Sequence, residues 1–232
     1  MKIRIKFAKH GTMKFIGHLD VMRYFQKAMR RADVDIRYSE GFSPHQIMSF
    51  AAPLGVGLTS NGEYLDIEVH STGSSEEMIR KLNGVMVEGF QILSWKKLGD
   101  DAGNAMSLVD SADYTLTFRK GYEPEDMESF LSGLEAFYSR PSIPIIKKTK
   151  KGEKEMDLKP LVYACQVTRG ETPSIFVKVS TGSSNNVKPE LFLETYCNEC
   201  GFPFSPFTFE IQREEIYAPG FVPLNDLGEN IE

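Results

Sequence analysis

The first residues of the chain alternate between polar and apolar side chains. Lys2-Ile-Arg-Ile-Lys-Phe7 has an apolar residue at every second position, which is typical of a strand with one buried face. Steps of 100° per residue predict an amphipathic helix over residues 18–32. Its expected core face is formed by Leu19, Met22, Phe25, Met29 and Ala32, and its polar face by Asp20, Arg23, Lys27, Arg30 and Arg31. The chain is therefore expected to open with a strand and a helix that has one basic face.

The remaining pattern predicts the same succession of elements in each half of the chain. In the first half, strands are expected over residues 34–38, 47–51, 64–69 and 90–96, and a second helix over residues 74–82. In the second half, strands are expected over residues 114–119, 143–148, 161–168, 174–179 and 207–213, and helices over residues 124–138 and 189–196. This order predicts an α+β protein made of two tandem ferredoxin-like βαββαβ units with antiparallel sheets.

The boundaries of these two units follow from breaks in the periodicity. The first unit is expected at residues 1–98, with a long loop insertion between residues 39 and 61, and the second at residues 112–218. Glycine and aspartate residues interrupt the pattern over residues 99–111, which predicts a linker there. Residues 219–232 are predicted to form an acidic tail.

Length and composition are those of an ordinary globular protein. The chain has 232 residues, of which 41% are hydrophobic and 25% are charged. No apolar run approaches the roughly 18 residues needed to span a membrane, and the N-terminal segment has no signal-peptide order. We therefore expect a cytoplasmic protein with no membrane partner.

The charge is unevenly distributed along the chain. The net charge of −5 argues against a protein coated with positive charge for general nucleic-acid binding. Residues 1–38, however, contain ten Lys and Arg residues against three Asp, a local surplus of seven positive charges. Residues 210–232 contain one Arg against six acids. A basic beginning is thus followed by an acidic end.

The three cysteines, Cys165, Cys197 and Cys200, are too few and too unevenly spaced for a disulfide framework. Cys197-Asn-Glu-Cys200 has the spacing of half a zinc site, but tetrahedral zinc needs a second pair of ligands. The sequence contains no matching Cys-x2-Cys or His-x3-His pair. We predict no metal site and no cofactor, and the role of Cys197 and Cys200 stays open.

Three residues are candidates for catalysis. In Gly41-Phe-Ser-Pro-His45 a flexible glycine and a rigid proline are able to present His45 from a loop. The competing interpretation is a turn in which Phe42 fills the core. His10 follows the first strand, and with His45 it would supply the acid and base for metal-independent RNA cleavage. His18 falls among apolar residues and is expected in the core. Asp66 is a candidate nucleophile for base modification.

The basic helix face suggests binding to nucleic acid. Its four cations, Arg23, Lys27, Arg30 and Arg31, are placed as phosphate contacts would require. Nearby Tyr24, Tyr38 and Phe42 offer stacking surfaces for unpaired bases. Tyr38, Phe42 and His45 are expected to bind RNA together with these four cations. The competing interpretation is a solvated helix face, in which Asp20 pairs with Arg23 three residues further on.

The same region resembles a bacterial family of radical-SAM-linked domains. The resemblance is carried by His18-Leu-Asp20, Arg23, Ala28, Arg30, Arg31, Tyr38-Ser39, Gly41-Phe-Ser-Pro-His45, Pro53-Leu54, Gly57, Ser60 and Glu63-Tyr-Leu-Asp66, and by the later landmarks Asp157-Leu-Lys159-Pro160 and Arg213-Glu-Glu-Ile216. Members occur as free-standing proteins and as the C-terminal part of radical SAM proteins. Because the chain has no Cys-x3-Cys-x2-Cys for an iron–sulfur cluster, the resemblance implies a separate radical SAM partner. The family's genomic association with ribosomal-protein and ribonuclease genes implies RNA metabolism.

These observations give three functional hypotheses. The first is an accessory protein that presents structured RNA, either tRNA or rRNA, to a radical SAM enzyme. The second is an enzyme that processes or modifies RNA with His10 and His45 or with Asp66, an idea supplied mostly by fold analogy. The third is a protein-only scaffold for the radical SAM partner. The basic N-terminal region favours the first.

Overall fold

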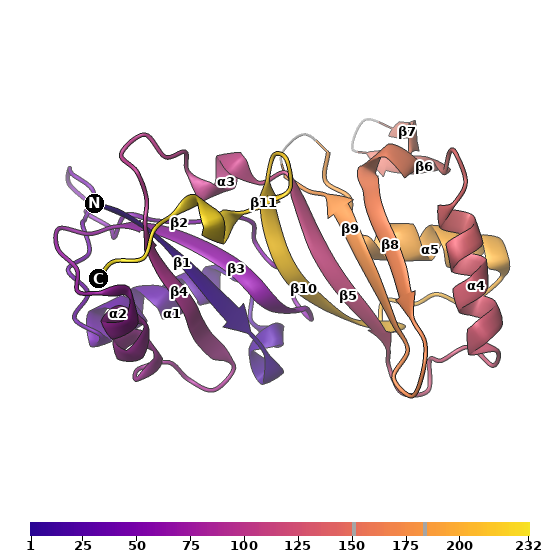
Figure 1. Cartoon of the computed structure of the whole chain (residues 1–232), viewed down its shortest axis with the longest axis horizontal. Coiled ribbons are helices and arrows are strands. Elements are labelled where there is room, and N and C mark those ends of the chain that lie inside the picture. The colour runs from indigo at the N-terminus through magenta and orange to yellow at the C-terminus, as the bar shows by residue number, and fades with distance from the viewer. Residues whose placement is uncertain (150–151, 183–184) are drawn as a thin grey trace. The chain divides into compact units, whose positions relative to one another are not determined.

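The computed structural model describes residues 1–149, 152–182 and 185–232, which form two units. Unit 1 contains Met1–Asp110 and Arg213–Glu232, and unit 2 contains Ser111–Gln212. The boundary between Gln212 and Arg213 falls inside one strand, β10 (Phe209–Ala218), through which the chain returns to unit 1. The predicted α+β class is confirmed (Figure 1), and the strands pair in mostly antiparallel fashion.

Unit 1 is built around one strand, β1, which pairs antiparallel with β3 on one side and with β4 on the other. The short strand β2 pairs with the end of β3, and β10 also lies next to β3. The elements are β1 (Lys2–Lys9), η1 (Gly11–Phe15), α1 (His18–Arg31), β2 (Met48–Phe50), β3 (Thr59–Glu68), α2 (Ser75–Asn83), β4 (Phe90–Lys97), α3 (Ala105–Leu108), β11 (Val222–Pro223) and η3 (Leu224–Leu227). A glycine is required in β3, because a Cβ on Gly62 would lie 2.5 Å from the carbonyl oxygen of Glu214.

The apolar face of β1 packs against α1, as its alternation predicts. Ile3, Ile5 and Phe7 are buried with Phe25 and Met29 of the helix. The helix face is turned slightly from the expected one: Val21 and Ala28 are buried, whereas the side chain of Leu19 is 61% exposed. Burial of these apolar side chains supplies the main free energy that holds α1 on the sheet.

Unit 2 has its own antiparallel sheet, in which β9 pairs with both β5 and β8. In the sheet order, β10 follows next to β5. The elements are β5 (Ser111–Phe118), α4 (Met127–Tyr138), β6 (Pro144–Thr149), β7 (Gly152–Asp157), η2 (Lys159–Leu161), β8 (Val162–Thr168), β9 (Ser174–Ser180) and α5 (Pro189–Cys200). The strand expected over residues 143–148 forms, as β6, but it pairs with β7 in a separate two-stranded sheet.

Three segments of unit 1 differ from the prediction. Residues 34–38 form only isolated bridges, from Ile36 to Val69 and from Tyr38 to Gln46, instead of a strand. The expected linker over residues 99–111 contains α3 and belongs largely to unit 1. The expected tail over residues 219–232 is folded: the side chain of Leu224 is fully buried, and Glu229 forms a bridge with Lys97 of β4. Figure 1 shows this yellow segment crossing the strands of unit 1.

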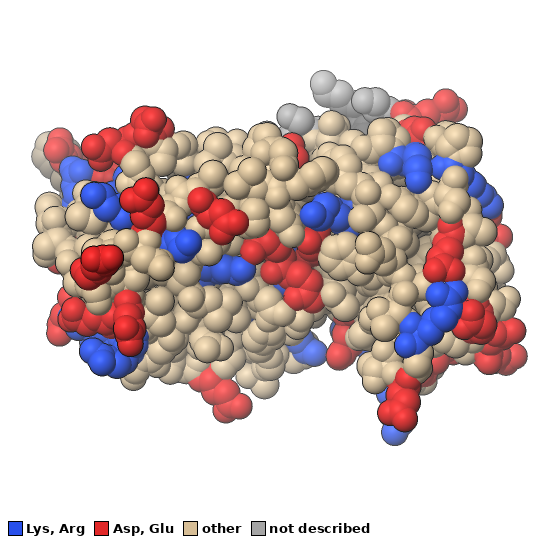
Figure 2. Space-filling model, viewed as in Figure 1, with Lys and Arg blue, Asp and Glu red and all other residues tan. Residues whose placement is uncertain are grey.

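The two ends of the chain, one basic and one acidic, partly neutralise each other. Nζ of Lys6 lies 2.6 Å from Oε2 of Glu215, and the hydroxyl of Tyr64 donates to Oε1 of the same carboxylate at 2.6 Å. On the face shown in Figure 2, basic side chains lie among acidic ones. Four further cations of residues 1–38 lie exposed on α1, with Asp20 as the one acid of that helix.

Candidate functional site

Helix α1 presents the four predicted phosphate contacts to solvent. Arg23, Lys27, Arg30 and Arg31 are all exposed. Nη1 of Arg23 lies 3.4 Å from Oδ1 of Asp20, a long contact between two well-exposed side chains that contributes little. Arg31 donates to the carbonyl oxygen of Val85 at 3.1 Å. The structure records no ion pair for Lys27 or Arg30 within its described residues. Most of the positive charge on this face is therefore uncompensated.

The loop over residues 38–46 is attached to α1 by one buried side chain. Nε2 of Gln46, a residue with 6% exposure, lies 3.3 Å from the carbonyl oxygen of Gln26 in α1 and 3.4 Å from the hydroxyl of Tyr38. The loop is closed at its base, because the amide of Ser39 donates to the carbonyl oxygen of His45 at 2.8 Å. Gln46 thus holds the predicted stacking residues beside the basic helix face.

Two aromatic side chains of this loop face solvent. Phe42 is fully exposed and Tyr38 is 46% exposed. The interpretation in which Phe42 fills the core is therefore wrong. Gly41, with a φ of +105°, adopts a backbone conformation that side-chain-bearing residues rarely adopt, and so allows the turn that points Phe42 outward. An exposed phenylalanine in a loop fixed at its base is suited to contact a flat partner.

The histidines lie at separate places in unit 1. His45 lines a cavity at the edge of the sheet, whereas His10 lines another pocket with Asn83 and Gln91. The structure does not bring His10 and His45 into one cavity, so their joint action as acid and base has no support in the geometry. His18 is half-buried, with its ring edge-on to Phe50 at 5.2 Å, which fits the expected packing role.

The cavity beside His45 has a volume of about 240 Å³. Ile47, Ile67 and Leu98 contribute apolar walls. Its polar lining residues are Lys2, His45, Ser49, Asp66, Glu68 and Asn104. The cavity therefore combines apolar walls with a set of hydrogen-bonding groups, which is the usual character of a small-molecule site.

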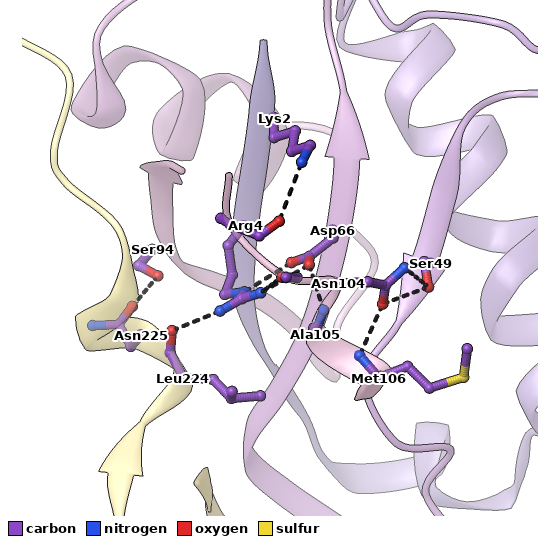
Figure 3. A network of polar contacts seen from close by, with 12 residues as sticks. Lys2, Arg4, Ser49, Asp66, Ser94, Asn104, Ala105, Met106, Leu224 and Asn225 are labelled. Atoms are coloured by element: carbon purple, nitrogen blue, oxygen red, sulfur yellow. Dashed lines mark hydrogen bonds and ion pairs between the residues drawn. The ribbon is translucent and has the colours of Figure 1, made fainter. Parts of the chain in front are cut away.

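Asp66, which lines this cavity, forms a buried ion pair with Arg4. The Arg4 guanidinium, only 2% exposed, bonds both carboxylate oxygens: Nε to Oδ1 at 2.8 Å and Nη2 to Oδ2 at 2.9 Å. The amide of Ala105 also donates to Oδ2, at 2.8 Å. Arg4 donates further to the carbonyl oxygens of Gly103 and Leu224 (Figure 3). An oxygen pair so fully engaged is a structural anchor, and this arrangement does not favour Asp66 as a nucleophile.

Sequence reasoning missed the polar residues on the cavity wall. Ser49 and Asn104 hydrogen-bond each other at 3.2 to 3.3 Å, and Oδ1 of Asn104 also accepts from the amide of Met106 at the start of α3 (Figure 3). At the rim, Nη1 of Arg37 lies 2.8 Å from Oε2 of Glu68. Asn104 belongs to no sequence motif. It lies within residues 99–111, which the composition predicts to be a linker.

One of the later landmarks of the resemblance, Arg213, is buried inside the protein. Arg213, 3% exposed, lies with Nε 3.2 Å from Oε1 of the buried Glu63 and donates to the carbonyl oxygen of Ala52. Lys9, 2% exposed, donates to the carbonyl oxygen of Ile16 at 3.0 Å. Burial raises the pKa of Glu63 and lowers the pKa of Lys9. The pairing of Arg213 with Glu63 offsets part of the cost of removing these charges from water.

The cysteines of α5 show no arrangement of metal ligands. Cys197 is buried, Cys200 is exposed, and Sγ of Cys200 lies 3.5 Å from the carbonyl oxygen of Cys197. Burial raises the pKa of the Cys197 thiol to about 12. Across the described residues, no three His, Cys, Asp or Glu side chains are grouped to hold a metal ion. Nor does any helix in that part of the chain have the length and apolar character needed to cross a membrane.

Fold and site together define a mixed α+β protein whose first unit carries a basic helix, an exposed aromatic loop and an adjoining cavity. The profile of the DUF2344 family, described as an uncharacterized protein conserved in bacteria, matches residues 2–189. The chain belongs to this family.

Comparison with curated proteins gives no match. Among solved structures, the chain is similar to one described as the crystal structure of a Cbf5-Nop10-Gar1 complex, with 12% identity and a TM-score of 0.47. That match covers 94% of this chain and 50% of the other, so the chain spans half of its length. A second structure, of an unknown protein from Galdieria sulphuraria, has 11% identity and a TM-score of 0.25, with 92% and 96% of the two chains covered.

The anchor role of Asp66 is testable by unfolding in urea. Asp66→Ala leaves the buried Arg4 guanidinium without its carboxylate, so we expect the free energy of unfolding to fall by about 3–5 kcal/mol. The control Asp20→Ala removes an exposed aspartate of the same unit and is expected to change stability by no more than about 0.5 kcal/mol. Equal effects of the two substitutions would show that the Arg4–Asp66 pair does not hold the fold.

Proposed function

We propose that the protein binds RNA through the outer face of α1 and the adjoining loop over residues 38–45, and that it presents this RNA to a separate modification enzyme. The observation that carries the proposal is the position of Gln46, which bonds to both α1 and Tyr38. It supports a continuous surface in which exposed cations lie beside exposed aromatic rings.

The chemistry of this surface fits unpaired RNA. Cations on α1 match the phosphate backbone, which supplies the sequence-independent part of the affinity. Phe42 and Tyr38 match the faces of bases that are free to unstack, as in the loops and bulges of tRNA and rRNA. Because these residues occupy a limited part of unit 1, a chain with a net charge of −5 is able to carry the surface.

We further propose that both units are ferredoxin-like. The order of elements supports this: β1-α1-β2-β3-α2-β4 in unit 1, and β5-α4-β8-β9-α5-β10 once the separate β6–β7 sheet is set aside. In unit 1, β2 is reduced to three residues, Met48–Phe50, so the 38–46 loop and the cavity lie where this strand is short.

The enzyme that receives the RNA is, in this proposal, a radical SAM protein, as the resemblance of the N-terminal region implies. The contribution of this chain is then to hold the substrate. The separation of His10 from His45 and the engagement of Asp66 by Arg4 favour this binding role over catalysis by the chain itself. A protein-only scaffold is the outcome if the chain shows no affinity for RNA.

Salt dependence tests the electrostatic part of the proposal. A labelled single-stranded RNA, followed by fluorescence anisotropy, is expected to bind more weakly as salt rises. The combined substitution Arg23→Gln, Lys27→Gln, Arg30→Gln and Arg31→Gln should weaken binding and reduce the slope of log K against log salt by up to about 3, at about 0.7 per lost phosphate contact.

The matched control removes four exposed cations elsewhere, as Arg80→Gln, Lys81→Gln, Lys120→Gln and Lys188→Gln. It changes the net charge by the same amount and should leave most of the affinity and the slope in place. Absence of RNA binding at low salt, or equal losses in both variants, would overturn the proposed surface.

Stacking is tested separately by Phe42→Ala. Loss of one base–aromatic stack is expected to weaken RNA binding by about 1–3 kcal/mol. Because Phe42 is fully exposed, the thermal unfolding temperature should stay unchanged, and the salt slope should stay that of the unsubstituted protein. Unchanged affinity would remove Phe42 from the interface.

A further inference from the structure

Arg31 differs from the other three cations of α1 because its guanidinium group is held in place. Nη2 of Arg31 donates to the carbonyl oxygen of Val85 at 3.1 Å, and the guanidinium carbon lies 5.6 Å from the centre of the Tyr24 ring. That separation lies within the range of a cation–π contact. A planar group with one hydrogen bond and one ring contact has few orientations left, so the direction of the Arg31 side chain is fixed before any ligand binds.

The ring that supports Arg31 is itself fixed. Tyr24 stacks on Phe90, with the ring centroids 4.9 Å apart and an angle of 18° between the ring planes. Its hydroxyl accepts from the amide of Val87 at 2.7 Å and donates to Sδ of Met86 at 3.4 Å. The sequence offers Tyr24 as a stacking surface for bases, but these contacts attach its side chain to the segment over residues 85–90. Tyr24 is therefore a support for Arg31 and not a free surface for a base.

The other cations of α1 have no comparable support. Nη1 of Arg23 has the long contact of 3.4 Å with the exposed Asp20. For the side chains of Lys27 and Arg30, no hydrogen bond, ion pair or ring contact is recorded within the described part of the chain. A long side chain loses rotamer entropy when a ligand fixes it, which weakens binding. Arg31 has lost part of that freedom beforehand, so its contact with a ligand costs less entropy.

The fixed guanidinium group keeps donors for a ligand. An arginine side chain has several N–H donors in one plane, and the Val85 carbonyl oxygen is the one acceptor recorded for Arg31 among the described residues. Arg31 is exposed, and the described carboxylates form no ion pair with it. The remaining donors are able to form two parallel hydrogen bonds to one phosphate group, a geometry that lysine does not offer.

We propose that Arg31 is a preorganised phosphate fork, which binds a backbone phosphate of the RNA through two parallel hydrogen bonds, and that Tyr24 is the residue that positions it. This inference rests on the proposed RNA-binding function. It identifies which of the four cations recognises a phosphate by geometry as well as by charge. Arg23, Lys27 and Arg30 contribute as mobile charges beside it.

The position of Arg31 also gives the path of the RNA strand over α1. Gln26, whose carbonyl oxygen accepts from Gln46 of the aromatic loop, lies about 140° from Arg31 around the helix axis at 100° per residue. The other three cations fall between these two positions on the helical wheel. A strand with one base on Phe42 and one phosphate at Arg31 therefore crosses the helix over its cations, from the loop to the segment over residues 85–90.

Substitution of arginine by lysine tests the fork, because it keeps the charge and removes the planar pair of donors. The probe is a single-stranded RNA with an internal fluorophore and hydroxyl groups at both ends, so that every phosphate is a backbone phosphodiester. By anisotropy, Arg31→Lys should bind it about tenfold more weakly, since a hydrogen bond to a charged group is lost, with an unchanged salt slope. Arg30→Lys should cost no more than about threefold. The control Arg80→Lys, an exposed arginine of α2, should keep the full affinity.

The positioning role of Tyr24 is tested by its dependence on Arg31. Tyr24→Leu removes the ring and should weaken binding about tenfold, whereas in the Arg31→Lys background it should cost little more, because the two residues act together. Tyr24→Phe keeps the ring and should keep most of the affinity. Losses that multiply in the double variant would show that Tyr24 does not act through Arg31. Thermal unfolding verifies that each variant is folded.

Preorganisation is measured in the protein without RNA. The NMR order parameter of the Nε–H bond should be higher for Arg31 than for Arg30, and it should fall to the value of Arg30 in Tyr24→Phe only if the hydroxyl, and not the ring, holds the support. We expect it to stay high in Tyr24→Phe, because the stacking on Phe90 is kept.

The outcomes separate the fork from the function on which it rests. RNA binding in which Arg31→Lys and Arg30→Lys lose equal affinity would overturn the fork and leave the RNA surface standing. An Nε–H bond as mobile in Arg31 as in Arg30 would do the same. If Arg31→Lys weakens binding only of a strand that carries a terminal phosphate, the assignment to a backbone phosphate is overturned. Absence of RNA binding at low salt refutes the proposed surface and the fork with it.

Discussion

The buried pair between Arg4 and Asp66 is the interaction on which unit 1 depends. An arginine with 2% exposure is costly to remove from water unless its donors are bonded, and here they reach a carboxylate and two backbone carbonyls. Those carbonyls belong to Gly103 and Leu224, far away in the sequence. The segments over residues 99–110 and 219–232 therefore have to dock on the sheet for the donors of Arg4 to be bonded (Figure 3). The first of these segments also lines the cavity, through Ala102, Gly103 and Asn104.

The opposite face of the same sheet packs against helix α1. Ile3, Ile5 and Phe7 bury the apolar side of α1, which turns its cations toward solvent. Gln46 then ties the aromatic loop to the helix, and His45 carries that loop to the cavity. One strand, β1, thus supports the proposed phosphate contacts through its apolar side chains and one boundary of the cavity through the pairing of Arg4 with Asp66.

Much of this arrangement could be predicted from local pattern. The period of the apolar residues predicts β1, α1, α2 and β4, and the charge on α1 identifies its solvent face. Composition did not predict that residues 99–111 and 219–232 fold onto the sheet, and these segments resemble a linker and a tail. Both segments bond to Arg4, which lies 99 positions from Gly103 and 220 positions from Leu224 in the sequence. The position of Asn104 in the cavity wall was missed for a similar reason, because its partner Ser49 is also distant in the sequence. The exposure of Phe42 depends on the contacts of Gln46 and on the backbone conformation of Gly41. The spacing of apolar residues along the chain predicts neither of these.

In the proposed function, RNA contacts α1 and the loop over residues 38–45 of unit 1. Ultraviolet crosslinking of the full chain to a single-stranded RNA, followed by mass spectrometry of the attached peptides, locates the contact directly. Crosslinks are expected in peptides that contain Tyr38, Phe42 and the residues of α1, because bases stacked on exposed aromatic rings are placed to react. Crosslinks confined to residues 111–212, or spread evenly over both units, would contradict it.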